Sequence, residues 1–257
     1  MNKSILGAAG AVLAVALSVG APDASAQSQS EGEANQLNDP RSAFINRNKR
    51  SFHADVERTE RGHKLGNAEA DTALIEFISY TCGHCAQFSR EADGAIDLAL
   101  LAPGHMSAEI RPIIRNYADL TVSLLAQCGP TDGFKARHQI FFATHDKWMA
   151  KLANAPQSQQ QSWARADKAA RISMASAMGF DDLMVSKGLT RTQITQCLSD
   201  DATAQKLVSN SNSDMKSFAV SGTPSFALNG ELLDGVHTWG ALYPVLSQQF
   251  VPEKQPN

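Results

Sequence analysis

The chain has 257 residues, of which 43% are hydrophobic, and a formal net charge of −3. This apolar content is enough for a buried core in one or two domains. Basic residues number 23 against 26 acidic ones. The composition therefore argues against a nucleic-acid partner, which would require a basic excess or a basic patch.

The first 26 residues have the pattern of a secretory signal peptide. Lys3 supplies the positive start, residues 5–20 are apolar and small, and Ala24-Ser25-Ala26 is an A-x-A cleavage site. The alternative is an uncleaved membrane anchor, but as a helix the apolar run spans only about 24 Å, less than a bilayer core. We therefore predict export to an oxidising compartment, where disulfides persist. Residues 27–62 would follow as a polar, partly disordered N-terminal extension.

Folded structure is expected from about His63. The apolar run at residues 73–80 predicts a buried strand, and the residues after Cys82 predict a helix with one apolar face. Residues 110–115 predict a second strand, which Pro112 would place at a sheet edge because proline cannot donate a ladder hydrogen bond.

Residues 119–218 predict a block of helices, because their apolar residues recur at three- and four-residue steps. Within this block the polar run 157–161 is expected to be a loop. Thr190 and Gln193 have the spacing of a capping box at the start of a helix.

Strand signals return near Phe226. Asn229-Gly230 predicts a type I′ hairpin turn, with residues 231–234 as the return strand. Thr238 then caps a last helix, in which Pro244 would cause a kink or delay the helix start.

The sequence Cys82-Gly83-His84-Cys85 ends the first strand and begins the first helix. A sulfur at a helix N-terminus is stabilised as a thiolate by unpaired N–H groups and the helix dipole. This placement indicates a redox-active pair of cysteines. The alternatives are a purely structural disulfide or half of a zinc site, although Cys128 and Cys197 supply no second Cys-x-x-Cys motif.

Two segments resemble a known family. Residues 74–85 (LIEFISYTCGHC) resemble the active-site strand and helix of DsbA-like thiol–disulfide oxidoreductases, members of the thioredoxin superfamily. Residues 220–230 (VSGTPSFALNG) resemble the family's cis-proline loop and hairpin. The resemblance, which covers residues 63–250, implies an α/β thioredoxin fold with an inserted all-helical domain. The thioredoxin-like domain would comprise residues 63–118 and 219–252, and the insertion residues 119–218.

The resemblance also implies roles for single residues. Cys82 would be the exposed nucleophile, Cys85 its buried partner, Pro224 a cis-proline facing them, and Glu76 a buried acid beneath the site. Gly83 and Thr223 differ from the residues that the strongest bacterial oxidases carry at these positions. The resemblance therefore leaves both directions of electron flow open.

Each of three of these positions also has an interpretation without a role in catalysis. His84 could stabilise the Cys82 thiolate, or be a solvent-facing spacer. Glu76 could take a proton from Cys85, or lie on an exposed face of its strand. Pro224 in cis form would let the Thr223 backbone pair with an extended substrate, while the Thr223 hydroxyl contacts the Cys82 sulfur; the alternative is an ordinary trans turn.

Cys128 and Cys197 both fall in the helical block. We interpret them as a structural disulfide that closes a loop of 69 residues, worth about 4 kcal/mol in the chain-entropy model. Two buried free thiols and a second redox pair are the alternatives.

The sequence thus predicts a periplasmic, monomeric thiol–disulfide oxidoreductase that introduces disulfides into reduced or unfolded secreted proteins. The predicted enzyme would need no cofactor or metal. The resemblance implies a quinone-linked membrane partner that would reoxidise it. One alternative is a disulfide isomerase or reductase kept reduced by a membrane donor. The other is a non-catalytic periplasmic chaperone.

Overall fold

A computed structural model describes residues 50–250 of the protein. The expected signal peptide and the first part of the expected N-terminal extension lie outside these residues. Among residues 50–250, no helix combines the length and the apolar content needed to span a bilayer.

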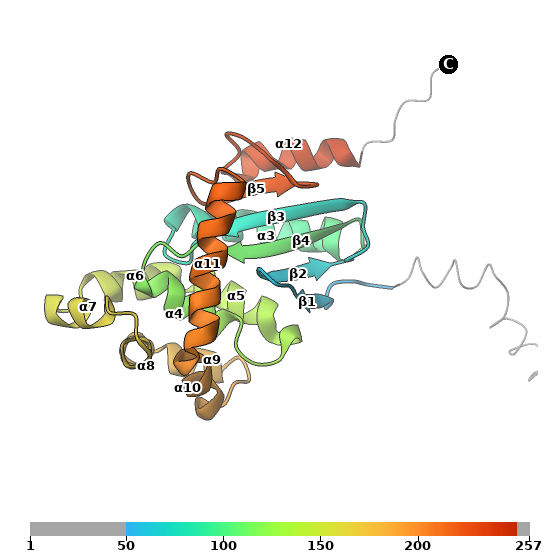
Figure 1. Ribbon diagram of the computed structural model, residues 1–257. Helices are drawn as coiled ribbons and strands as arrows, with labels where there is room; N and C mark the ends of the chain where they lie inside the picture. The colour runs from blue at the N-terminus through green and yellow to red at the C-terminus, as the bar shows by residue number, and fades with distance from the viewer. Residues whose placement is uncertain (1–49, 251–257) are drawn as a thin grey trace, which may run out of the picture. The chain divides into compact units, whose positions relative to one another are not determined.

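The centre of the fold is a six-stranded sheet in the order β1-β2-β4-β3-β5-β6 (Figure 1). β3 and β4 are parallel neighbours, and every other pair is antiparallel. A parallel pair needs a crossover connection, which α3 (Gly83–Ile96) and a π-helical turn (Asp97–Leu101) supply. The strands are β1 (Val56–Arg58), β2 (His63–Gly66), β3 (Thr72–Ile78), β4 (Met106–Pro112), β5 (Ser225–Leu228) and β6 (Glu231–Leu232).

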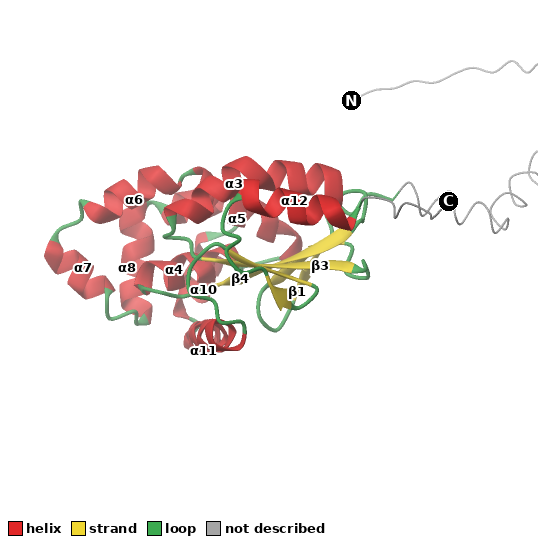
Figure 2. Ribbon diagram, turned by 90° about the horizontal axis from the view of Figure 1, so that it is seen from above, coloured by secondary structure: helices red, strands yellow, loops and turns green. Residues whose placement is uncertain are grey.

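Helices fill the chain between β4 and β5 and follow β6. Figure 2 shows α3 and α12 on one side of the sheet and α11 on the other, with α4, α6, α7 and α8 at one end of the sheet. The helices after α3 are α4 (Tyr117–Ala126), α5 (Phe134–Ala143), α6 (His145–Ala153), α7 (Gln157–Trp163), α8 (Lys168–Met178), α9 (Phe180–Val185), α10 (Arg191–Ser199), α11 (Asp201–Ser217) and α12 (Trp239–Gln249), with a 3-10 turn at Thr131–Gly133.

One apolar cluster runs from the sheet through α3 into the helical block. α3 belongs to it because its apolar residues, including Cys85 and Phe88, fall on one buried face, as predicted. The Phe88 ring packs against Phe226 of β5 with the ring centroids 4.8 Å apart. This contact holds the start of α3 close to the segment that leads into β5.

Several local predictions are confirmed. Thr190 and Gln193 form a complete capping box at the start of α10. The hairpin turn is formed by Asn229 and Gly230, with φ of +50° and +88°, the two positive values that a type I′ turn requires. Thr238 caps α12 by accepting a hydrogen bond from the Ala241 N–H.

Three expectations were wrong. The sheet begins at Val56 rather than near His63, because β1 is an edge strand, where charged residues can face solvent. β4 is not an edge strand: it lies between β2 and β3, and Pro112 comes after its last pair with β2, at Ile110.

The third error concerns a helix. The glutamine-rich run 157–161 is part of α7, which is anchored by the buried Trp163. Pro244 was expected to kink the last helix or to delay its start. It lies inside α12, which starts at Trp239, so a delayed start is excluded. Cys128 lies just beyond α4.

Candidate active site

The Cys-x-x-Cys motif lies where the sheet meets α3. Cys82 is the N-cap residue of α3, four residues after β3 ends, and Cys85 lies one turn along. Both residues are thiols. Cys82 is more covered than the resemblance implied, with 8% of its surface exposed against none for Cys85. The reason is the loop before β5, because the Cys82 sulfur is 3.1 Å from the Thr223 carbonyl oxygen, to which it donates a hydrogen bond in its thiol form.

The two thiols differ sharply in acidity. A hydrogen bond from the Cys85 side chain, assisted by the Thr223 side chain and by the backbone N–H groups of Cys85 and His84, lowers the pKa of Cys82 to about 4. Burial, which acts in the opposite direction on Cys82, raises the pKa of Cys85 well above its ordinary value. At neutral pH Cys82 is therefore a thiolate, the nucleophilic form of cysteine, while Cys85 keeps its proton.

The loop 222–225 is the second part of the site. The Thr223–Pro224 peptide bond is cis, and Thr223 is 9% exposed. Ser225 pairs with Phe77 near the end of β3, so the sheet register brings this loop beside Cys82. The Thr223 hydroxyl oxygen is buried and has no hydrogen-bond partner among the described residues. It is thus free to donate to the sulfur once Cys82 is ionised.

Glu76 lies on β3 beneath the cysteines. β3 is an interior strand, and Glu76 is only 7% exposed, so the exposed-face alternative does not hold. Burial, strengthened by the negative charge of Asp93, raises the pKa of Glu76 well above its ordinary value. Because it holds a proton more firmly than an exposed glutamate, Glu76 is suited to exchange a proton with Cys85.

His84 lies on the exposed side of α3. What it contributes to the site in this structure is its backbone N–H, which helps to stabilise the Cys82 thiolate and lower the pKa of Cys82. The exposed imidazole fits the alternative of a solvent-facing spacer.

Sequence reasoning missed Asp119 and Asp93. The Asp119 carboxylate on α4 accepts hydrogen bonds from the Ser79 hydroxyl and the Thr81 N–H, both at 2.8 Å, and so fixes the turn that leads to Cys82. Burial raises the pKa of Asp93, on α3, to about 6. Asp93 could have been suspected, because it follows the buried Ala92 at the border of the apolar face of α3. The role of Asp119 depends on tertiary contacts that local patterns do not report.

The remaining cysteines are joined to each other. Cys128, just after α4, and Cys197 on α10 form a disulfide with their Cα atoms 5.8 Å apart. In this structure they are neither free thiols nor paired with the cysteines of α3.

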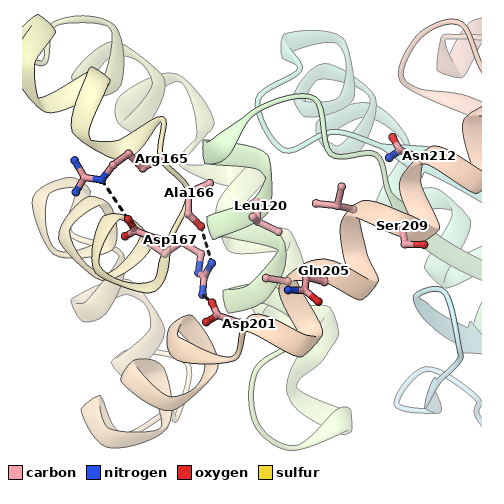
Figure 3. A pocket seen from close by; sticks show the side chains of 11 residues that line it. Leu120, Arg165, Ala166, Asp167, Asp201, Gln205, Ser209 and Asn212 are labelled. Carbon is pink, nitrogen blue, oxygen red and sulfur yellow. Dashed lines mark hydrogen bonds and ion pairs between the residues drawn. The ribbon is translucent and has the colours of Figure 1, made fainter.

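One pocket lies away from the cysteines. Its volume is about 530 Å³, and Figure 3 shows its lining from α4, α11 and the segment between α7 and α8, with Leu120 and Ala166 among the apolar residues. Arg171, which borders it, already donates to the Leu198 and Ala166 carbonyls and to Asp201. None of the active-site residues lines this pocket, so it is not the redox site.

Among residues 50–250, no three or more His, Cys, Asp or Glu side chains gather in a way that could hold a metal ion.

The fold and the paired cysteines define a thioredoxin-like redox protein, and comparisons with known proteins agree. The thioredoxin family model matches residues 58–247. A solved protein-disulfide isomerase from Novosphingobium aromaticivorans is 36% identical and has a TM-score of 0.70, with 74% of this chain and 99% of that chain covered. The chain therefore belongs to the thioredoxin family.

More distant matches agree on the fold. Wolbachia pipientis alpha-DsbA1 is 18% identical, with a TM-score of 0.59 and coverage of 72% of this chain and 89% of that one. A curated Rickettsia bellii relative, named for protein-disulfide oxidoreductase activity, is 26% identical over 70% of this chain; the match spans 62% of that relative's length. The predicted fold class, a thioredoxin fold with added helices, is confirmed.

Proposed function

We propose that this protein is an exported disulfide oxidase that acts on newly secreted polypeptides. The observation that carries the proposal is that the pKa values of the two thiols are shifted in opposite directions. The pKa of Cys82 is lowered to about 4, and the pKa of Cys85 is raised. A stabilised Cys82 thiolate favours the reduced enzyme, which makes the Cys82–Cys85 disulfide a stronger oxidant.

The reaction follows from this asymmetry. A substrate thiolate attacks the Cys82 sulfur of the oxidised enzyme, forms a mixed disulfide, and expels Cys85 as a thiolate that takes up a proton. A second substrate thiolate then attacks the substrate sulfur of the mixed disulfide and expels the Cys82 thiolate, a good leaving group because its pKa is low. The substrate loses two electrons, and the enzyme gains them as a thiolate at Cys82 and a thiol at Cys85.

The neighbouring residues have distinct roles in this proposal. Glu76 exchanges a proton with Cys85 from beneath the site. Thr223 pairs through its backbone with the extended substrate, and Pro224 keeps this backbone turned toward the sulfur. His84 contributes through its N–H to the stability of the Cys82 thiolate.

The location and partners are part of the same proposal. The signal-peptide pattern of residues 1–26 supports export, and the Cys128–Cys197 disulfide fits an oxidising compartment such as the periplasm. The clients would be reduced or unfolded secreted proteins, met by a monomeric enzyme. By the family resemblance, a quinone-linked membrane protein would reoxidise it.

A second candidate is a disulfide isomerase, favoured by the name of the 36% identical Novosphingobium protein and by Thr223 before the cis-proline. The two functions differ in the form of the enzyme that reacts. An oxidase accepts electrons as a disulfide, whereas an isomerase attacks wrong substrate disulfides as a Cys82 thiolate.

The test combines an equilibrium with two substrates. The Cys82–Cys85 pair is equilibrated with glutathione, and the protein is incubated with a reduced dithiol peptide and, separately, with scrambled ribonuclease. We expect a strongly oxidising pair and rapid peptide oxidation, both abolished in Cys82→Ser. A thioredoxin-like potential, or isomerisation well above peptide oxidation, would reverse the ranking. Holdase activity retained by an exchange-dead Cys82→Ser variant would instead indicate a chaperone.

A further inference from the structure

His237, in the loop between β6 and α12, contacts the active-site loop 222–225. Its Nδ1 atom is 2.7 Å from the Pro224 carbonyl oxygen and 3.5 Å from the Ser225 hydroxyl oxygen. Because a carbonyl oxygen can only accept, Nδ1 must carry a proton and donate it. The tautomer of His237 is therefore fixed by this contact.

Two hydrogen bonds near His237 hold the backbone carbonyls of the residues before and after Thr223. The Ser225 hydroxyl donates to the Gly222 carbonyl at 2.9 Å, and the His237 imidazole donates to the Pro224 carbonyl. Gly222 precedes Thr223 and Pro224 follows it. The one carbonyl between them, that of Thr223, is left to face the Cys82 sulfur.

The residues after His237 contact the other half of the site. Thr238 caps α12, and the Trp239 ring packs edge-on against Phe88 of α3 with the centroids 6.4 Å apart. Since Cys82 is the N-cap residue of α3, the segment 237–239 touches both the helix next to the nucleophile and the loop that faces it. It is placed to fix their separation.

We propose that His237 is a positioning residue for polypeptide substrates, a proposal that rests on the oxidase function above. By holding the Pro224 carbonyl, His237 fixes the backbone of Thr223 in the orientation that pairs with an extended polypeptide. It acts through Pro224 and takes no part in sulfur exchange. Its loss therefore weakens the binding of a peptide more than it slows the exchange of sulfur atoms.

Substitutions at residue 237 that shift the position of the N–H donor distinguish the positioning of the Pro224 carbonyl from a general structural role of His237. An asparagine amide nitrogen can occupy about the place of Nδ1, whereas a glutamine amide nitrogen extends to that of Nε2. We expect His237→Ala and His237→Gln to raise KM for a reduced dithiol peptide about fivefold, the effect of one net hydrogen bond. kcat should change less than twofold. His237→Asn should restore KM to within about twofold of the unsubstituted protein.

Asp234→Ala, an exposed position on the same loop, is the matched control. Denaturation midpoints show whether each variant is folded, and should His237→Ala not fold, the comparison of Asn with Gln decides alone. Equal KM values for Asn and Gln, or a loss in kcat with KM unchanged, would overturn the proposal. If the unsubstituted protein oxidises no peptide, the proposed function fails, and small-thiol exchange at Cys82 then shows whether the sulfur itself is at fault.

Discussion

Cys82 and Cys85 lie one helical turn apart, and their pKa values are shifted in opposite directions. The low pKa of Cys82 depends first on the Cys85 thiol. Cys85 donates a hydrogen bond that is the main cause of the low Cys82 pKa of about 4. We predict that Cys85→Ala raises the Cys82 pKa, whereas Cys85→Ser, whose hydroxyl can still donate, keeps it lower than in Cys85→Ala. Ultraviolet absorbance of the thiolate, followed from acid to neutral pH, measures both.

The same titration has a check in reactivity. The alkylation rate of Cys82 should follow the absorbance curve in each variant, because the thiolate is the species that reacts. Cys82 pKa values that stay at that of the unsubstituted protein in both Cys85→Ala and Cys85→Ser would show that the helix terminus, rather than Cys85, sets the acidity of Cys82.

The buried acid beneath the cysteines makes stability depend on pH. The Glu76 pKa is raised above its ordinary value of 4.5 by burial and then by Asp93, so above that pH the folded protein retains a proton that the unfolded chain has released. Stability therefore falls as pH rises from about 4.5 through the raised pKa, by about 1.4 kcal/mol per pH unit. We predict that Glu76→Gln is more stable than the unsubstituted protein at neutral pH, and that the difference disappears in acid.

Guanidinium denaturation of the oxidised forms at the two pH values measures this difference and removes any contribution from the Cys82 thiolate. A Glu76→Gln advantage that does not change with pH would mean that Glu76 is ionised in the folded protein.

At the scale of elements, the sequence predicted what local chemistry controls. The junction of β3 with α3, the capping box at Thr190 and the hairpin at Asn229-Gly230 each depend on residues a few positions apart, and all three are present. The α7 helix was mistaken for a loop because its glutamines are polar, and what stabilises the helix is the burial of Trp163 by other elements.

The candidate site divides in the same way. Cys82, Cys85 and Pro224 carry their own local signals. The contacts of Asp119 with Ser79 and of His237 with Pro224 join segments that only the folded chain brings together, so no local pattern could reveal them.

One element-scale prediction concerns α10, which the Cys128–Cys197 disulfide ties to the end of α4 across 69 residues. Replacing both cysteines by alanine should lower the free energy of unfolding by about 4 kcal/mol, the loop-closure entropy that the bond removes from the unfolded chain. Denaturant unfolding measures it. The peptide-oxidation rate of the folded variant should change little if the bond is structural. A large loss of that rate without loss of stability would point to a second redox pair.

At the scale of the whole molecule, a buried charge network joins α11 to the sheet. The Asp214 carboxylate on α11 is 1% exposed and accepts hydrogen bonds from Arg61 at 2.8 Å and from Arg111 of β4 at 3.3 Å. Arg111 is also paired with Glu109. Burial raises the Asp214 pKa even though two arginines face it. Without Asp214, Arg111 keeps Glu109 as its partner, whereas Arg61, whose side chain is 35% exposed, loses its carboxylate.

We predict that Asp214→Ala lowers the free energy of unfolding by about 3 kcal/mol, because two guanidinium groups then lose their shared acceptor. Asp214→Asn, which keeps one acceptor oxygen, should lose less. Guanidinium unfolding followed by far-UV circular dichroism and by tryptophan fluorescence measures both variants. Because one apolar cluster links the sheet and the helices, the two signals should change together in each case. Separate transitions in Asp214→Ala alone would show that this network, rather than the shared core, makes the two parts unfold as one.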